Sequence, residues 1–359
     1  MGSGATQLLR TVIFEPNGHG HRFWYCNLLM AHQLDRNDPV EVVTSRASSA
    51  LAEYRTHIAP MVERGATVTF LPGEPTSGGV AVTVRHVAYL IRTARRGGCR
   101  VVVPEADRLV LACSLLAPAF PRDSLSLLVM RPGTSWKQRF KHGCGRLLAR
   151  RQRVHELGDP LGIRRGRDVV RDPVLRGSTP ARPPGDRRSS RYTLLIAGVI
   201  DERKCVRPIL DAARTNDSVH VVMAGRHSPG IRRLLDTVPL EERSRFTSID
   251  RFLSDDELVE EVSRADAVSV VLNTTSGSSG MLGQAVAMRK PVLAAHNMTV
   301  SASVRASGIG VVADSTAPVD LARAIRELMS GDFRSALEDA AVSLDYGSSF
   351  HSVLAGSSP

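Results

Sequence analysis

The chain has 359 residues, of which 42% are hydrophobic, and this is enough to bury substantial cores in two domains. No stretch approaches the roughly 18 uninterrupted apolar residues that a membrane span needs, and the start lacks the apolar segment of a secretion signal, so we expect a cytoplasmic protein. The net charge is +11, but aromatic residues make up only 4% of the chain and no aromatic-interleaved basic motif occurs, which argues against nucleic acid as a partner.

Basic residues concentrate between Arg131 and Arg191, and such stretches also suit acidic small molecules and anionic lipid headgroups. Peripheral contact with the inner membrane face therefore stays open as an alternative. The five cysteines contain no CxxC pair and no companion histidine at metal spacing. We expect a reducing compartment and no metal site.

The first half of the chain predicts strands that alternate with helices. Strands are expected at 11–14, 40–44, 67–71, 100–104 and 125–130, and helices at 22–34, 47–63, 82–96 and 108–116. Strands alternating with helices of this length imply a parallel, doubly wound sheet. We place this first domain at residues 1–175.

A segment rich in Pro, Gly and Arg follows, and we place the linker at 176–191. The second half then restarts with strands at 193–197, 220–224, 246–249 and 268–272, and with helices at 208–214, 229–235 and 320–329. Ser254 and Glu257 have the spacing of a capping box at the start of a further helix. We place a second domain at 192–340 and a tail at 341–359, for which a return to the first domain is one possible course. The expected fold class is α/β, with two Rossmann-like doubly wound domains that face a cleft.

The turn after the first predicted strand reads EPNGHGHR, from Glu15 to Arg22. Ligands of doubly wound sheets bind beyond the carboxyl ends of the strands, so turns of this kind are candidate sites. Gly18 and Gly20 allow close approach of the backbone, and His19 and His21 bring titratable imidazoles. The alternative interpretation is a pair of exposed loop histidines.

The first strand of the second half leads into a turn from Gly198 to Cys205, in which Lys204 stands at the entry to a helix. An ammonium group there can reach a phosphate, or it can merely solvate the start of the helix. Arg226 follows the next predicted strand, where it can approach a phosphate or remain a solvated loop cation.

The turn Ser276-Gly277-Ser278-Ser279-Gly280 lies between an apolar strand and a helix in which Gly283 is small enough for close packing. It offers backbone N–H groups and hydroxyls at the positive end of a helix, which favours a phosphate or diphosphate ligand. The alternative is that Ser278 or Ser279 caps the helix and that the glycines only make a tight turn.

With these motifs the chain resembles the GT-B glycosyltransferases, especially the group-1, family 4-like enzymes. Their second domain carries a G-R-x-x-x-x-K-G pattern whose Arg and Lys hold the donor diphosphate; Gly198 and Lys204 match it, whereas Val199 takes the place of the arginine. The run A285-V-A-M-R-K-P-V292 matches the end of the family's later E-x7-E segment. The two glutamates of that segment fall on Ser276 and Gln284, and a glutamine can still hydrogen-bond a ribose diol. The resemblance covers roughly residues 192–329.

The resemblance implies a metal-independent, cofactor-free glycosyltransferase that moves a sugar from a nucleotide-diphosphate sugar, with UDP-sugars favoured, to the hydroxyl or amine of a small-molecule or lipid-linked acceptor. The residues that it implies for the diphosphate are Gly198, Lys204, Ser276, Gly277, Ser278, Ser279 and Gly280. Those for the nucleoside are Arg226, Arg251, Phe252 and Gln284, and those for the acceptor side of the cleft are Gly18, Gly20 and Glu105.

Inverting GT-B enzymes use a histidine of a G-H loop as the base, which points to His21 or His19. Family 4 enzymes retain configuration and need no such base, so the stereochemistry stays open. For Glu105 and Asp107, a helix N-cap and an exposed turn carboxylate are the alternatives to acceptor contacts. Two other functions also remain: a sugar-nucleotide 2-epimerase or hydrolase of the same fold, and a non-catalytic accessory protein.

Overall fold

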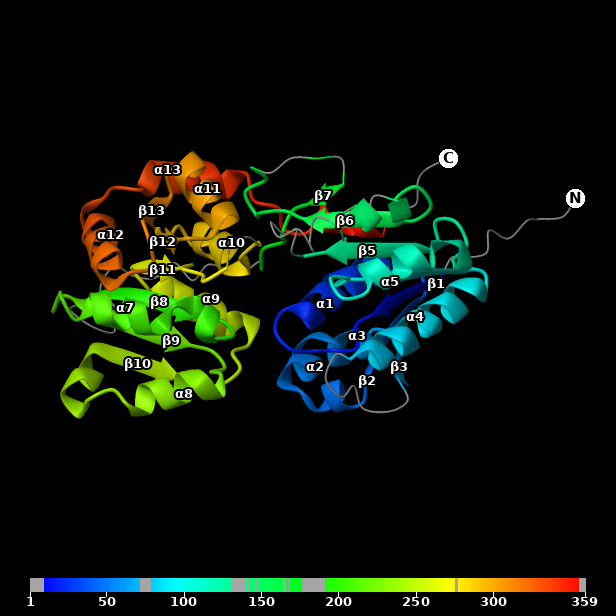
Figure 1. Ribbon diagram of the computed structural model, residues 1–359, viewed down its shortest axis with the longest axis horizontal. Coiled ribbons are helices and arrows are strands. Elements are labelled where there is room, and N and C mark those ends of the chain that lie inside the picture. Colours follow the sequence, from blue (N-terminus) through cyan, green and yellow to red (C-terminus); the bar gives the residue numbers. More distant parts are fainter. Residues whose placement is uncertain are drawn as a thin grey trace, which may run out of the picture. The chain divides into compact units, whose positions relative to one another are not determined.

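The computed structural model describes residues 10–71, 79–130, 140, 143–145, 147–163, 166, 168–175, 191–274 and 277–354. The chain divides into two compact units. Of the described residues, the first unit holds those up to Leu157, Gly166–Val170 and those from Ser348 onward; the second holds those of Gly158–Arg165 and Arg171–Gly347. Each unit contains one sheet with helices on both faces (Figure 1).

The first unit has a seven-stranded sheet in the order β3-β2-β1-β4-β5-β6-β7, and all its strand pairs are parallel. The strands are β1 (Arg10–Phe14), β2 (Val40–Ser45), β3 (Thr67–Leu71), β4 (Cys99–Val103), β5 (Leu125–Val129), β6 (Arg153–Leu157) and β7 (Val169–Val170). The order along the sheet reverses between β1 and β4. In doubly wound sheets this switch point is where ligands bind, beyond the carboxyl ends of the strands.

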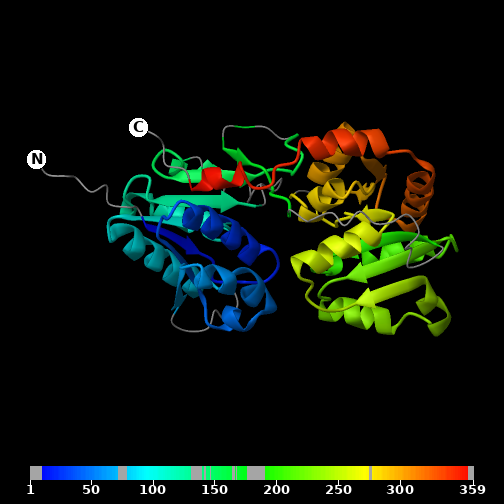
Figure 2. The same cartoon turned by 180° about the vertical axis from the view of Figure 1, so that it is seen from behind.

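Alternate residues of β1 point to two separate cores. Val12 and Phe14 pack against α4 (Val80–Arg95) and α5 (Val110–Leu115), whereas Ile13 packs against α1 (Arg22–Asp35). Figures 1 and 2 show α4 and α5 on one face of this sheet and α1 on the other. Strands that are apolar on both faces are typical of parallel sheets covered by helices on both sides.

The prediction of one continuous helix at 47–63 is wrong. The structure has a 3-10 helix η1 (Ala47–Ala50), then α2 (Ala52–His57) and α3 (Ala59–Glu63). Leu51 is extended, with ψ of 150°, and Pro60 lies in the first turn of α3. Proline fits the first turn of a helix but cannot continue one, because it lacks the N–H that an interior position donates.

The second unit repeats the architecture with a six-stranded parallel sheet in the order β10-β9-β8-β11-β12-β13. The strands are β8 (Tyr192–Ala197), β9 (Val219–Ala224), β10 (Phe246–Ile249), β11 (Ala267–Ser269), β12 (Val292–Ala295) and β13 (Gly310–Ala313). The switch point lies between β8 and β11. The predicted α/β class with two doubly wound parallel sheets is confirmed.

Two cores flank the second sheet as well. On one face lie α7 (Val206–Ala213), α8 (Pro229–Asp236) and α12 (Pro318–Ser330); on the other lie α9 (Asp255–Arg264), α10 (Gly280–Ala287), α11 (Met298–Ser307) and α13 (Arg334–Val342). The predicted capping box is confirmed: the Glu257 N–H donates to Ser254 Oγ, and the Ser254 N–H donates to the Glu257 carboxylate at 2.8 Å. In the described ranges, no helix combines the length and hydrophobicity that a membrane crossing needs.

The division of the chain differs from the predicted boundary at residue 175. Leu161 and Val174 belong to a core of the second unit, so residues 158–165 and 171–175 are part of that unit. From Ser348 the chain belongs to the first unit, where Phe350 and Val353 are buried in the core beneath α1. The predicted linker, apart from Arg191, lies outside the described residues.

Candidate functional site

The turn after β8 holds Lys204 beside the end of the strand. Gly198 has φ of +89°, and a Cβ added there would lie 3.7 Å from Lys204 Nζ. This ammonium group donates a hydrogen bond to the Ala197 carbonyl. Burial lowers the pKa of Lys204 to about 8, an effect that Asp201 opposes and Arg203 reinforces. A buried amine of this kind gains charge stabilisation when an anion arrives.

Gly225, at the end of β9, allows two turns to pack closely. It has φ of +137°, and a Cβ there would lie only 1.9 Å from the Gly198 carbonyl oxygen. The Ile200 N–H donates to the Arg226 carbonyl at 2.8 Å, so the pairing of the two chains continues past the strands. These contacts fix the turn that carries Lys204.

The Ser/Gly turn leads into α10, and neither of its described serines caps that helix. Ser279 occupies the N-cap position, but its side chain makes no capping hydrogen bond. The Ser278 hydroxyl instead donates to the Asp172 carboxylate at 2.6 Å. Gly277 takes φ of +121°, and Ser276 lies outside the described residues. Without a side-chain cap, the first N–H groups of α10 keep their capacity to bind an anion.

The segments that follow β8 and β11 meet at the switch point of the second sheet. The Asn273 N–H, between β11 and α10, donates to the Arg203 carbonyl at 2.6 Å. Lys204 and the Ser/Gly turn thus follow β8 and β11, the neighbouring strands between which the order reverses. Sequence analysis missed Asp172, which is 2% exposed, because its contact with Ser278 spans 106 residues of chain.

The predicted nucleoside residues lie in three places. Arg226 is half-buried after β9, while Arg251 and Phe252 follow β10, at the same carboxyl edge of the sheet. Arg251 is exposed and forms an ion pair with Glu257 at 2.6 Å. Gln284 lies one turn into α10 and is 2% exposed, and its Nε2 has no hydrogen-bond partner among the described residues. Buried amides are normally paired, so this donor is suited to a ligand oxygen.

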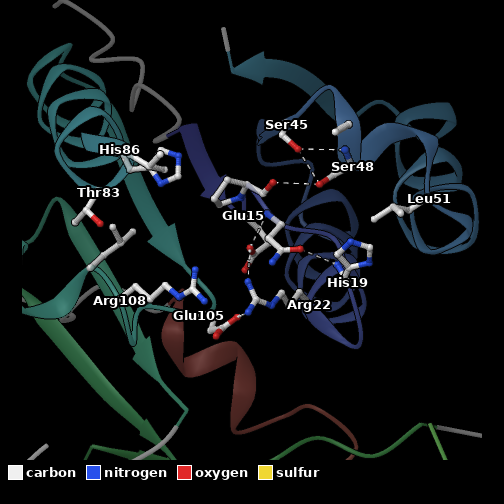
Figure 3. A pocket seen from close by; sticks show the side chains of 15 residues that line it. Glu15, His19, Arg22, Ser45, Ser48, Leu51, Thr83, His86, Glu105 and Arg108 are labelled. Atoms are coloured by element: carbon white, nitrogen blue, oxygen red, sulfur yellow. Dashed lines mark hydrogen bonds and ion pairs between the residues drawn. The ribbon is translucent and has the colours of Figure 1, made fainter. Parts of the chain in front are cut away.

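The first unit contains a pocket of about 310 Å³ at its own switch point (Figure 3). Glu15 directly follows β1 and Glu105 follows β4. Thr83 and His86 of α4 lie on one side of Glu15, and Ser48 on the other. The full lining is Glu15, Pro16, Asn17, His19, Arg22, Ser45, Ala47, Ser48, Leu51, Val82, Thr83, His86, Glu105, Arg108 and Leu109.

Arg22 links the two carboxylates of the pocket. Its Nη1 lies 3.4 Å from Glu15 Oε1, and its Nη2 forms an ion pair with Glu105. The Asn17 N–H also donates to Glu15 Oε1, at 3.0 Å, while Glu15 Oε2 is buried with no hydrogen-bond partner among the described residues. Burial raises the pKa of Glu15 to about 8; Arg22 opposes this shift and Glu105 adds to it.

The predicted loop residues divide between this pocket and its support. His19 lines the pocket, whereas His21 precedes α1 and packs edge-on against Tyr25, with ring centroids 5.1 Å apart. A Cβ on Gly18 would lie 2.1 Å from the Phe23 ring, so this glycine serves packing. Gly20 turns the chain with φ of +75°.

Sequence analysis did not single out Glu15 or Arg22. The available signal was an acidic residue that directly follows a buried strand. Asp107, by contrast, has a structural role, because its carboxylate accepts the Met130 N–H at 3.0 Å.

No protein-family model matches the sequence, and no curated protein sequence matches it. Solved structures do match, over almost the whole chain. WaaG, a glycosyltransferase involved in lipopolysaccharide biosynthesis, is 11% identical with a TM-score of 0.64, over 96% of this chain and 98% of WaaG. Anabaena HepE in complex with UDP is 13% identical with a TM-score of 0.67, over 96% and 98%. S. aureus MnaA with UDP is 13% identical with a TM-score of 0.60, over 96% and 93%.

The chain has the GT-B fold. Its two doubly wound sheets are the two Rossmann-like domains of that fold, so the architecture that the sequence motifs imply is confirmed. Each GT-B domain of this chain carries polar side chains at its switch point: Lys204 and the Ser/Gly turn in the second, and the Glu15 pocket in the first.

Proposed function

We propose that the chain is a glycosyltransferase that moves a sugar from a nucleotide-diphosphate sugar to a small-molecule or lipid-linked acceptor, without a metal. The observation that carries this proposal is the hydrogen bond that joins the segments after β8 and β11, which lead to Lys204 and to the Ser/Gly turn, at one switch point. A UDP-sugar is the favoured donor. In support, HepE, which shares the fold, has been solved with UDP and with UDP-glucose.

The leaving diphosphate needs groups that stabilise its growing negative charge. Lys204 supplies an ammonium group whose pKa burial has lowered to about 8, and a bound anion raises that pKa again and keeps the group charged. The uncapped N–H groups at the start of α10 and the helix dipole add neutral stabilisation. Together they replace the charge that the family's arginine brings and that Val199 lacks.

The nucleoside half of the donor would lie along the same edge of the second sheet. Gln284 offers the ribose hydroxyls a buried amide whose Nε2 has no hydrogen-bond partner in the part of the chain that the structure describes. Arg226, Arg251 and Phe252 follow β9 and β10, where the base would be held. The acceptor, with a hydroxyl or an amine as its attacking group, would occupy the pocket of the first unit, whose volume of about 310 Å³ lies within the range of small-molecule sites.

Calorimetry with UDP-, GDP-, TDP- and ADP-sugars tests the donor assignment. Lys204→Met keeps much of the side-chain volume but removes the charge, and Arg207→Ala, an exposed change on α7 beyond the turn, is the control. We expect the wild type and the control to bind one nucleotide sugar alike, and Lys204→Met to bind it at least about tenfold more weakly, or 1.4 kcal/mol. Equal binding by Lys204→Met would refute the diphosphate assignment.

Two other functions remain as alternatives, because Val199, Ser276 and Gln284 replace an arginine and two glutamates of the family's motifs. Incubation with UDP-GlcNAc and no acceptor tests the first alternative. Release of free UDP with N-acetylmannosamine, or formation of UDP-ManNAc, would indicate a 2-epimerase or hydrolase. Failure of every nucleotide sugar to bind would indicate a non-catalytic accessory protein.

A further inference from the structure

We propose that Glu15 is the general base of the transfer and that its carboxylate takes the proton of the attacking acceptor group in the pocket at the carboxyl ends of β1 and β4. This inference rests on the proposed function. It assigns to Glu15 the role for which His19 and His21 were the candidates, and it implies a direct displacement with inversion at the anomeric carbon.

The geometry of the carboxyl group carries the assignment. The Glu15 side chain is 2% exposed, and its Oε1 is held by the Asn17 N–H and the Arg22 guanidinium. Oε2 is buried and has no hydrogen-bond partner among the described residues. A buried carboxylate oxygen is normally paired, so Oε2 is the position at which a ligand hydroxyl completes the hydrogen bonding. Glu15 also lies between the two sides of the pocket (Figure 3).

Neither histidine has an equivalent place. His19 is an exposed loop residue at the pocket wall, and His21 precedes α1 with its ring against Tyr25. A base must lie within hydrogen-bond reach of the proton that it removes, and the enclosed carboxylate is better placed to meet a ligand that fills the pocket.

The surroundings of Glu15 also suit a base that works near neutral pH. The charged and titratable groups around it are Arg22 and Cys26 on α1, Glu105 and Arg108 after β4, His86 on α4, and His19 on its own loop. Burial is the main cause that raises the pKa of Glu15 to about 8, and burial lowers the pKa of His86, which favours the neutral imidazole. A general base is most effective when its pKa lies close to the working pH.

The proposed step balances as a single displacement. The acceptor oxygen forms a bond to the anomeric carbon while the bond from that carbon to the diphosphate oxygen breaks. The electron pair of the broken bond leaves with the diphosphate, and the proton of the acceptor hydroxyl moves to Glu15 Oε2. The product sugar therefore has the opposite anomeric configuration to the donor sugar.

The test compares Glu15→Gln, Glu15→Asp and His19→Gln with a control that removes another buried glutamate, Glu41→Gln on β2. Nucleotide release is followed with the donor that calorimetry selects, with glycerol, methyl glucoside and methyl N-acetylglucosaminide as acceptor probes. We expect Glu15→Gln to bind the donor as the wild type does while kcat falls at least about 100-fold. Glu15→Asp should keep part of the activity and Glu41→Gln most of it, and kcat should fall less in His19→Gln than in Glu15→Gln.

The pH profile separates a base from a structural role. Wild-type kcat/KM should rise about tenfold per pH unit up to about pH 8, above which the loss of the Lys204 charge lowers it, and the rising limb should be absent from Glu15→Gln. Nuclear magnetic resonance of the product should show inverted configuration. A retained configuration, or a Glu15→Gln enzyme with normal kcat and an unchanged profile, would overturn the assignment.

Infrared titration gives a readout that needs no turnover. The C=O stretch of a protonated Glu15 carboxyl should be present at pH 7, disappear through about pH 8, and be missing from Glu15→Gln. A Glu15 that is already ionised at pH 6 would contradict the raised pKa and the predicted rise of kcat/KM up to pH 8, while leaving donor binding untouched. Failure of the wild type to bind any nucleotide sugar would instead contradict the proposed function.

Discussion

The Ser278 hydroxyl donates a hydrogen bond to the Asp172 carboxylate over 2.6 Å, so an acidic side chain lies at the turn to which we assign the diphosphate. Asp172 is 2% exposed and comes from the segment that joins the second unit ahead of its first strand. A carboxylate there orients the serine but opposes a bound anion. Asp172 therefore orders the turn and at the same time weakens the attraction of the turn for an anion.

Asp172→Asn separates these two effects, because an amide oxygen can still accept the hydrogen bond of Ser278 without carrying charge. We expect UDP to bind Asp172→Asn about fivefold more tightly, or roughly 1 kcal/mol, because a nearby like charge is removed. Calorimetry at low and high salt measures the UDP affinity of both proteins. The gain in affinity should be smaller at high salt, because salt screens the repulsion. Unchanged or weaker binding would contradict a repulsion between Asp172 and the ligand.

Lys204 should make nucleotide binding depend on pH. Its ammonium group has a pKa lowered to about 8 in the empty protein, so above that pH the amine is neutral and must take up a proton to pair with a diphosphate. We expect UDP affinity to fall by up to about tenfold per pH unit above pH 8, with proton uptake on binding. Calorimetry in buffers of different ionisation enthalpy measures both quantities. Lys204→Met should show neither effect; the same pH dependence in that variant would assign it to another group.

Glu15 should make stability depend on pH. Its pKa is about 8 in the folded chain, against 4.5 in the unfolded one, so the stability present below pH 4.5 is lost at up to about 1.4 kcal/mol per pH unit as the pH rises to 8. Glu15→Gln cannot ionise and should be the more stable protein at pH 9, with a smaller advantage at pH 5. Thermal unfolding at both pH values measures this difference. A stability difference of the same size at pH 5 and pH 9 would contradict the raised pKa of Glu15.

Two glycines of α10 give a matched pair for the packing of this helix. A Cβ on Gly283 would lie 2.6 Å from Val174 Cγ2 and 2.9 Å from Pro160 Cβ, whereas a Cβ on Gly280 meets no atom of the described residues within 4 Å. Both changes to alanine gain helix propensity, but Gly283→Ala must also displace its neighbours. We expect Gly283→Ala to destabilise the protein by about 1–3 kcal/mol and Gly280→Ala to be neutral or stabilising. Denaturant unfolding measures the free energy of unfolding of both variants. Equal changes in the two variants would contradict the close packing around Gly283.

The local pattern of the sequence predicted most strands of both sheets, because strands that are buried on both faces and helices with one apolar face each leave a clear period; β6, β7 and β13 were not predicted. The capping box at Ser254 was predictable for the same reason, since its two residues are three positions apart. Pro60 indicated the break before α3, but we expected one helix because the apolar spacing continues across the break.

Features that depend on distant parts of the chain were not predictable. The contacts of Gly283 with Val174 and Pro160 place residues 158–165 and 171–175 in the second unit, although their composition is typical of a linker. Asp172 meets Ser278 across 106 residues. The role of Glu15 depends on Arg22 and Glu105, which only the switch point brings together.

A crystal structure of the complex with UDP would show where the second unit holds the diphosphate. We expect diphosphate oxygens within about 3 Å of Lys204 Nζ and of the backbone N–H groups that begin α10, with the ribose near Gln284. UDP bound instead in the Glu15 pocket, or away from the turns after β8 and β11, would contradict this expectation.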